Sequence, residues 1–519
     1  MKHPRRLPLL GISSRVKRPR RRRFSVVLRV RLAVVVLGLS SWAGVARAYD
    51  AMVQASVTSQ SYQVRDAGDR ALTLSRLDTY LRLFILDILP RKKRKSGPEP
   101  TQMHFVASMR LRADFGGYTR DWDQAFDVHG ADGGFSPVFE LLYAHLAVTD
   151  IAGFIDLKVG RQFHLDPMDF YGFDGLQVRF KTPFYVAFEL VGGRRQSGLY
   201  NSYFADAPIF LLQGSDNTDS NLGWMPMMGV AAETSGLSFL RLRVAYRAVW
   251  HIIDSNDPGR VYPDGLGDYL PRTAVNAEKL SAHATATFWK QRLQLYGGVR
   301  YNVLSSRLDE AQGGVGFRYG PARVRAEYVI DSPDFDGDSI FNIFNTQAYQ
   351  EVRLWYEHRF NARWAAYARV TARLFEGGAS DAPDQTERRL VEPDIGGGVG
   401  GTYLGKRQTA RLDLYWQEGY GGRTLGVYGY YRYQVVPRWL ALEGRAVVAY
   451  WDDDLSTTPE GVSAGLSLGA RLQLTQLVAV HVLVEDNFGT YSKSDLRLYG
   501  MLNFAWCTYR ACPAGEVVP

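Results

Sequence analysis

Apolar and polar residues alternate with a period of two along most of this chain. In 104–115 every odd position is apolar and most even positions are polar or charged, and 463–474 shows the same alternation. Successive side chains of a β-strand point to opposite faces, so the pattern predicts strands with one apolar face. These segments run for about 9–12 residues, the length that a tilted strand needs to cross a bilayer. Strands of soluble sandwiches are shorter, at about 5–6 residues.

The alternation predicts 22 strands along the chain. An even number brings both chain ends to the same side of a closed barrel. Counts of 18 or 20 remain open, because strand boundaries are the least reliable part of such a prediction. The predicted strands are 51–64, 72–86, 102–115, 138–149, 153–162, 174–181, 184–192, 225–234, 238–250, 279–289, 292–301, 312–320, 322–330, 347–360, 364–375, 395–404, 407–417, 424–434, 438–451, 462–474, 477–488 and 495–506.

The predicted connections alternate between short and long. Gly320-Pro321 and Gly405-Lys406 are typical of the short ones, and 193–224 and 251–277 of the long ones. Tight turns at one end and long loops at the other are typical of an all-β, transmembrane antiparallel up-and-down β-barrel. In such a barrel the short turns face the periplasm and the long loops face outside.

The first 48 residues resemble an export signal. An uncharged, mostly apolar run at 32–43 follows an arginine-rich segment and precedes Ala46-Arg47-Ala48. This is the order of regions in a secretory signal peptide, and the apolar run is too short to span a bilayer as a helix. We therefore expect cleavage after Ala48, a barrel over 49–506 and a periplasmic tail over 507–519.

The net charge of +9 would suggest a nucleic-acid binder if it were spread over the chain. The first 48 residues, however, contain 13 Lys and Arg and no acidic residue, and the remaining 471 residues carry a net charge of −4. We therefore expect no nucleic-acid partner. A mean hydropathy of −0.21 argues against a bundle of membrane-spanning helices, and a hydrophobic content of 46% argues against disorder.

The last predicted strand ends on Trp506. In this it resembles bacterial outer-membrane β-barrel proteins, whose apolar final strand closes on an aromatic residue that the barrel assembly machinery reads. Here a further 13 residues follow the aromatic residue, which departs from that pattern. The resemblance implies residence in the outer membrane of a Gram-negative bacterium, with membrane lipid, lipopolysaccharide and the assembly machinery as partners.

A second resemblance covers about 25 residues. Gly160, Arg161 and Gln162 end one predicted strand, and Phe173, Asp174 and Gly175 open the next. The two groups resemble a strand–loop–strand of porins, in particular alginate-export-type and related sugar porins. This resemblance implies a channel for sugar-like solutes, and the rest of the chain is similar only in pattern.

The inward parity of the predicted strands carries more basic than acidic residues. Such a wall raises the local concentration of anions, and arginine forks suit carboxylate and phosphate groups. The alternative is that these charges pair across strands and only hydrate the wall. Tyrosines on the same parity could stack on sugar rings or only fill space. The arginines predicted to line the pore are Arg110, Arg112, Arg179, Arg241, Arg243, Arg323, Arg325, Arg369, Arg373, Arg432, Arg445 and Arg471.

A long loop that folds inward would constrict such a pore. The first candidate is 193–224, because Pro208, Phe210 and Leu211 belong to a stretch too apolar to lie in open water. Loop 251–277 is the second candidate.

Other motifs suggest chemistry only weakly. Gly461–Gly465 matches the serine nucleophile elbow but begins a strand, and that motif requires a strand–turn–helix. A Ca²⁺ site at Asp334, Asp336 and Asp338 is a weaker interpretation than an acidic external turn. Cys507 and Cys512 could form a local disulfide or remain free thiols.

Three classes of function follow. The first is a porin-like channel for passive diffusion of small or oligomeric, anionic or sugar-like solutes. The second is a sealed barrel with a structural, adhesive or assembly role. The third is a barrel enzyme, for which the sequence offers no nucleophile–base set. No cofactor is expected.

Overall fold

A computed structural model describes most of the chain after the leader. The described residues are 50–66, 71–89, 101–115, 136–166, 168–196, 225–252, 273–332, 348–376, 390–419, 422–452, 460–490 and 492–508. No helix among these residues is long and apolar enough to span a bilayer.

The described residues form 22 strands, as the alternation predicts. Most strands extend one to several residues beyond the predicted ranges. They are β1 Asp50–Asp66, β2 Ala71–Leu86, β3 Gln102–Phe115, β4 Ser136–Ile151, β5 Ile155–Asp166, β6 Asp169–Lys181, β7 Val186–Arg195, β8 Pro226–Thr234, β9 Leu240–Ile252, β10 Thr273–Phe288, β11 Leu293–Asn302, β12 Arg307–Tyr319, β13 Ala322–Asp331, β14 Tyr349–Arg359, β15 Trp364–Glu376, β16 Leu390–Leu404, β17 Gln408–Gly419, β18 Gly422–Val436, β19 Leu440–Asp452, β20 Glu460–Gln473, β21 Val478–Gly489 and β22 Ser492–Cys507.

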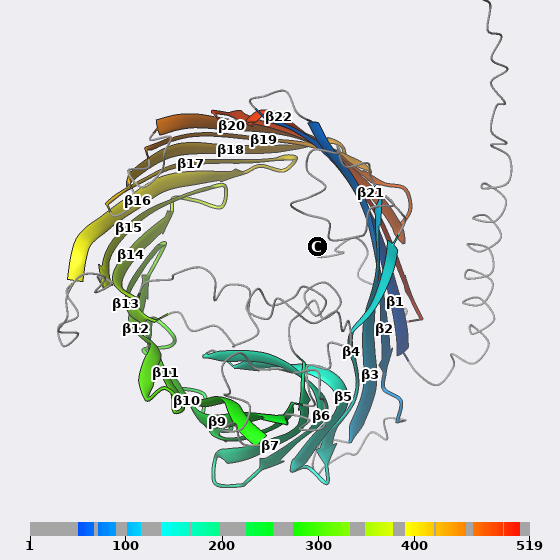
Figure 1. The fold of residues 1–519 in the computed structure, drawn as a ribbon, viewed down its shortest axis with the longest axis vertical. Coiled ribbons are helices and arrows are strands. Elements are labelled where there is room, and N and C mark those ends of the chain that lie inside the picture. The colour runs from blue at the N-terminus through cyan, green and yellow to red at the C-terminus, as the bar shows by residue number, and fades with distance from the viewer. Residues whose placement is uncertain are drawn as a thin grey trace, which may run out of the picture. The chain divides into compact units, whose positions relative to one another are not determined.

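Each strand pairs antiparallel with its neighbours in sequence, and β1 pairs with β22 to close the barrel (Figure 1). Closure gives every strand a partner on both sides. The backbone polar groups are therefore satisfied within the sheet, which is the condition for a β-structure to cross a bilayer. The predicted fold class, a closed antiparallel up-and-down barrel, is confirmed.

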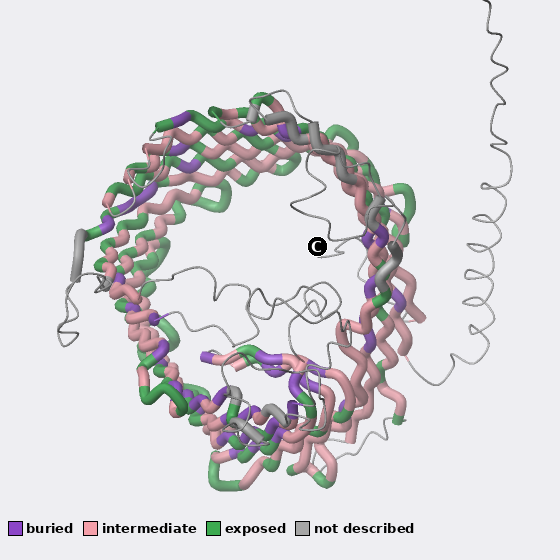
Figure 2. Tube along the Cα trace, viewed as in Figure 1, coloured by how far each residue is buried: buried purple, intermediate pink, exposed green. Residues whose placement is uncertain are grey.

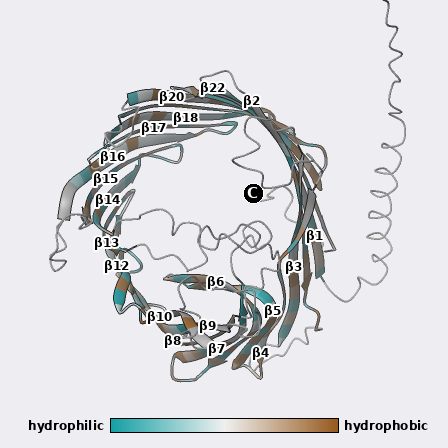
Figure 3. Cartoon of the chain, in the orientation of Figure 1, coloured by the Kyte–Doolittle hydropathy of each residue, from teal (hydrophilic) through white to brown (hydrophobic). Residues whose placement is uncertain are grey.

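The outer face of the barrel is apolar. Exposed large side chains such as Leu111, Val244, Val352 and Leu412 lie on the outward parity of their strands. Figure 3 shows apolar and polar residues alternating along the strands. A band of exposed aliphatic residues would be unfavourable in water, and it is what a lipid-facing barrel wall requires.

Strands β5 and β6 bend into the lumen. The sequence places 163–173 in a connection, and this is wrong. Both strands continue, to Asp166 and from Asp169, and their tip lies inside the ring (Figure 1). The pairing of β4 with β5 ends at Ala144–Arg161, although both strands run further, so β5 separates from the wall there.

A row of glycines marks this bend. Gly160, Gly175 and Gly193 are directly paired across β5, β6 and β7. Gly160 has φ +123°, a conformation that favours glycine, and a Cβ on Gly175 would overlap the carbonyl oxygen of Gly192. The backbones therefore approach more closely than any side chain would permit.

The main apolar core lies between this infolded hairpin and the wall behind it. Buried residues gather there in Figure 2. Phe173 and Val249 are fully buried, and they belong to one cluster with Tyr171, Val191, Met225, Met227 and Ala277.

Candidate functional site in the barrel lumen

The infolded hairpin identifies the inner face of the wall. Arg243 of β9 donates to Asp166 at the hairpin tip, so Arg243 points inward. Residues that are directly paired across strands share a face, and so do residues two apart on one strand. The inner face therefore follows the pairing from Arg243 through His283, Gly298, Gln312, Val329, Glu351 and Arg373.

Arg243 holds the hairpin with several ion pairs. Its guanidinium lies 2.6 Å from Asp166, 2.6 Å from Glu189 of β7 and 2.9 Å from Glu233 of β8. It also contacts His164 at 3.1 Å. The side chains of Arg243, Glu189 and Asp166 are only 10%, 7% and 2% exposed. We call these five residues the Arg243 cluster.

Further contacts fix the tip against β9 and β11. Arg247 binds both carboxylate oxygens of Asp169, at 2.6 and 3.0 Å. Arg300 donates to the backbone carbonyl of Met168 at 2.9 Å. A cavity of about 20 Å³ remains between tip and wall, enough for one water molecule.

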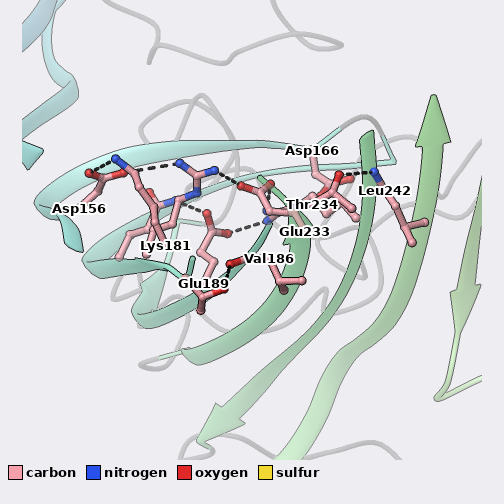
Figure 4. Close-up of polar contacts among 12 residues, drawn as sticks. Asp156, Asp166, Lys181, Val186, Glu189, Glu233, Thr234 and Leu242 are labelled. Carbon is pink, nitrogen blue, oxygen red and sulfur yellow. Dashed lines mark hydrogen bonds and ion pairs between the residues drawn. The ribbon is translucent and has the colours of Figure 1, made fainter. Parts of the chain in front are cut away.

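The charges of the network continue toward the short-turn end. Arg179 pairs with Glu233 and, at 3.5 Å, with Asp156. Lys181 lies 2.8 Å from both Asp150 and Asp156 (Figure 4). This side of the lumen is therefore largely neutralised by its own ion pairs.

The porin-like motif lies at the bend. Arg161 and Asp174 are directly paired and form a two-pronged ion pair, with N–O distances of 2.8 and 2.9 Å. Gln162 is 1% exposed and donates to the carbonyl oxygen of Gly175. Together with Gly160, these motif residues fix the point at which the hairpin turns inward.

The far face of the hairpin is apolar. Leu165 is 79% exposed and Phe170 is 51% exposed. Phe163 stacks on Phe170, with ring centroids 5.7 Å apart. The hairpin thus offers an apolar surface to the lumen and a charged surface to the wall.

The wall from β12 to β20 has a different character. Between the paired row Arg325–Trp355–Arg369 and the short turns, nine inward arginines accompany three inward carboxylates, Glu357, Asp413 and Glu443. We call this surface the arginine–aromatic wall. Its arginines are Arg318, Arg323, Arg325, Arg359, Arg369, Arg411, Arg432, Arg445 and Arg471, and its rings are Trp355, Tyr367, Tyr415, Tyr428 and Tyr430.

Ring faces and guanidinium groups lie together on this wall. Trp355 and Tyr367 are stacked, with centroids 5.0 Å apart and planes at 9°. Arg325 lies 5.9 Å from the centroid of Trp355, and Arg411 lies 5.8 Å from that of Tyr367. The side chains of Arg325 and Arg411 are nevertheless 43% and 48% exposed. These cations therefore remain accessible to a solute.

Inward glycines let the tyrosine rings lie close to the wall. A Cβ on Gly400 would collide with the ring of Tyr367, and a Cβ on Gly426 would collide with that of Tyr415. A ring that covers a glycine presents its face, rather than its edge, to the lumen.

The predicted pore-lining arginines fall into two groups. Some are held by carboxylates. Arg110 pairs with Glu140, Arg112 with Asp78 and Arg373 with Glu351, as Arg179 and Arg243 do with the partners given above. Arg325 and Arg445 pair with the acidic residue two positions away yet remain exposed. The arginines that form no ion pair within the described residues are Arg241, Arg323, Arg369, Arg432 and Arg471.

The structure places more acidic residues on the inner face than the alternation predicts. They include Asp78, Glu140 and Asp309, and the hairpin adds Asp166 and Asp169. Asp166, Asp169 and Asp309 lie beyond the predicted strand ends, and the pairing of β3 with β4 shifts register between Ser108 and Met109, close to Glu140. The cationic excess is therefore local to the arginine–aromatic wall.

Several predicted residues lie outside the described part of the chain. They are Pro208, Phe210, Leu211, Asp334, Asp336, Asp338 and Cys512. Cys507 is disulfide-bonded. Within the described residues no group of three or more His, Cys, Asp or Glu side chains could hold a metal ion.

This chain has the architecture of a membrane-spanning, closed antiparallel β-barrel. No family model matches the sequence, and no curated protein matches it. Among solved structures, OccAB4 of Acinetobacter baumannii is similar with a TM-score of 0.43 and 8% identity, over 89% of this chain and 99% of that one. OpdQ of Pseudomonas aeruginosa is similar with a TM-score of 0.42 and 9% identity, over 89% and 99%. At these values the likenesses bear on neither solute nor mechanism.

Proposed function

We propose that the protein is an outer-membrane channel for passive diffusion of anionic, ring-bearing solutes such as acidic sugars. The lipid-compatible outer face and the charged lumen support this proposal. The protein would be exported by the leader, cleaved after Ala48 and inserted by the barrel assembly machinery among lipid and lipopolysaccharide of a Gram-negative bacterium. It would act without catalysis.

The observation that carries the proposal is the arginine–aromatic wall. Exposed guanidinium groups alternate there with ring faces, for example Arg325 beside Trp355 and Arg445 at 5.8 Å from the centroid of Tyr430. A guanidinium binds a carboxylate through two parallel hydrogen bonds, and an aromatic face stacks on a sugar ring. Many such weak sites in sequence favour passage over retention.

The infolded hairpin would constrict the path. The ion pairs of the Arg243 cluster neutralise the charged face of the hairpin. The hairpin therefore contributes little to the electrostatic field in the lumen. Its exposed Leu165 and Phe170 narrow the lumen with apolar surface. A solute would then follow the remaining cationic wall.

Two measurements on the purified barrel test this function. We expect stepwise conductance in planar bilayers, and in liposome swelling we expect faster entry of a hexuronate than of the neutral hexose. Replacing Arg325, Arg369 and Arg445 with glutamine should abolish that preference while leaving hexose entry unchanged. A folded barrel without conductance would contradict the channel and favour a sealed barrel with a structural or adhesive role.

A further inference from the structure

The short-turn end of the barrel carries an uneven distribution of charge. Six basic side chains lie on four turns between β10 and β19, and all six are exposed. The segments 289–292, 360–363, 405–407 and 436–439 contain no acidic residue. The six residues, none of which forms an ion pair within the described residues, are Lys290, Arg292, Arg363, Lys406, Arg407 and Arg438. We call this arc the basic rim.

Most turns on the remaining arc differ, although the connection between β2 and β3 carries five basic residues at 91–95. The described turns at 152–154, 182–185, 235–239 and 474–477 contain no Lys, Arg, Asp or Glu. Because β10 to β19 are consecutive neighbours in the barrel, the four basic turns lie along one arc, interrupted by the uncharged turn Gly320-Pro321 between β12 and β13. With strands about 4.8 Å apart, successive hairpins are separated by about 10 Å.

Aromatic side chains accompany the basic turns. Trp289 is 69% exposed, Phe360 64%, Trp439 55% and Trp364 52%. Exposed aromatic rings at the ends of membrane-spanning strands lie at the level of the lipid head groups. The neighbouring Lys and Arg side chains are long enough to lie at the same depth.

We propose that the basic rim binds the phosphate groups of anionic phospholipids in the adjoining leaflet. The rings set the depth, and the unpaired cations face the layer in which lipid phosphates lie. A water-filled lumen needs no such charges on its outer edge, and the neutral turns of the other arc show that barrel closure does not require them. Anionic lipid should therefore gather along the basic rim.

The test compares lipids retained by the mature barrel. Barrel extracted from nanodiscs of equal phosphatidylglycerol and phosphatidylcholine is analysed by native mass spectrometry, and we expect wild type to retain phosphatidylglycerol preferentially. Replacing Arg363, Arg407 and Arg438 with glutamine should lower that preference by about tenfold or more. The corresponding lysine variants should keep it, because lysine also binds phosphate.

The lumen variant of Arg325, Arg369 and Arg445 is the matched control, since it removes the same charge from the same barrel. It should keep the lipid preference, whereas the rim variant should keep the solute preference. Failure of one proposal can therefore be distinguished from failure of the other. Equal retention of both lipids by wild type, or an unchanged preference in a folded rim variant, would overturn the proposal.

Discussion

Replacing Arg243 with methionine should release the infolded hairpin. The guanidinium lies within 3 Å of Asp166, Glu189 and Glu233, and two of these carboxylates are less than a tenth exposed. Methionine preserves most of the side-chain volume but leaves Asp166 and Glu189 without their arginine, whereas Glu233 keeps its ion pair with Arg179. The perturbation is therefore electrostatic rather than steric.

Breaking a buried ion pair by removing one partner costs about 3–5 kcal/mol. Because about 1.4 kcal/mol is a factor of ten, the equilibrium between docked and undocked hairpin should shift by roughly a hundredfold to several thousandfold. Arg247 and Arg300 would still hold Asp169 and Met168. We therefore expect a hairpin that exchanges between docked and undocked positions, in a barrel that remains closed.

Single-channel recording checks this expectation. The Arg243→Met channel should show a larger mean conductance and more open-channel noise than wild type. A second variant that also carries Asp166→Asn and Glu189→Gln should recover quiet openings, since most of the uncompensated buried charge is gone. Wild-type conductance and noise in a folded Arg243→Met barrel would refute the assignment of the Arg243 cluster as the clamp of the hairpin.

Three further predictions concern the glycine bend of the infolded hairpin, the arginine–aromatic wall and the electrostatic field in the lumen. Gly175→Ala should lower the unfolding free energy in urea by about 1–3 kcal/mol, because its Cβ would overlap backbone; Gly192→Ala, whose Cβ would meet nothing within 4 Å, is the control and should cost far less. Gly426→Val should displace the ring of Tyr415 and weaken current block by a hexuronate, whereas Gly313→Val, whose Cβ lies in open space, should not. The preference for anions should be stronger in 0.1 M than in 1 M salt, because the screening length falls from about 10 Å to about 3 Å; a preference independent of salt would count against a field from the wall.

The alternation was sufficient to predict the barrel and its strand number. The outer face of each strand contacts lipid and the inner face contacts water. The apolar positions in the sequence of a strand therefore show which side chains point outward. Even the first two strands, where the pattern is least regular, pair as predicted, with Asp50 opposite Leu86.

The infolded hairpin could not be predicted in this way. Alternation distinguishes two faces of a strand, but it does not show whether the strand follows the wall or leaves it. Phe163 and Leu165 therefore fall in the predicted connection between strands 153–162 and 174–181. The one signal was the set of glycines at 160, 175 and 193, and it has meaning only when the register that aligns them is known.

The charges of the lumen were predicted only in part. Parity identified Arg325 and Arg369 as inward, but pairing depends on contacts across strands far apart in sequence. Arg243 and Asp166 are 77 positions apart and meet only because the hairpin folds inward. The sequence therefore could not show which arginines are neutralised and which stay accessible.

The reversal potential of the reconstituted barrel in a KCl gradient tests the central claim most directly. Because the arginines of the arginine–aromatic wall are exposed, we expect chloride to permeate faster than potassium. The sign of the reversal potential should show this selectivity. The potential should also move toward zero when Arg325, Arg369 and Arg445 are replaced with glutamine. A potential of the sign for potassium selectivity, or one that the replacement leaves unchanged, would contradict the account.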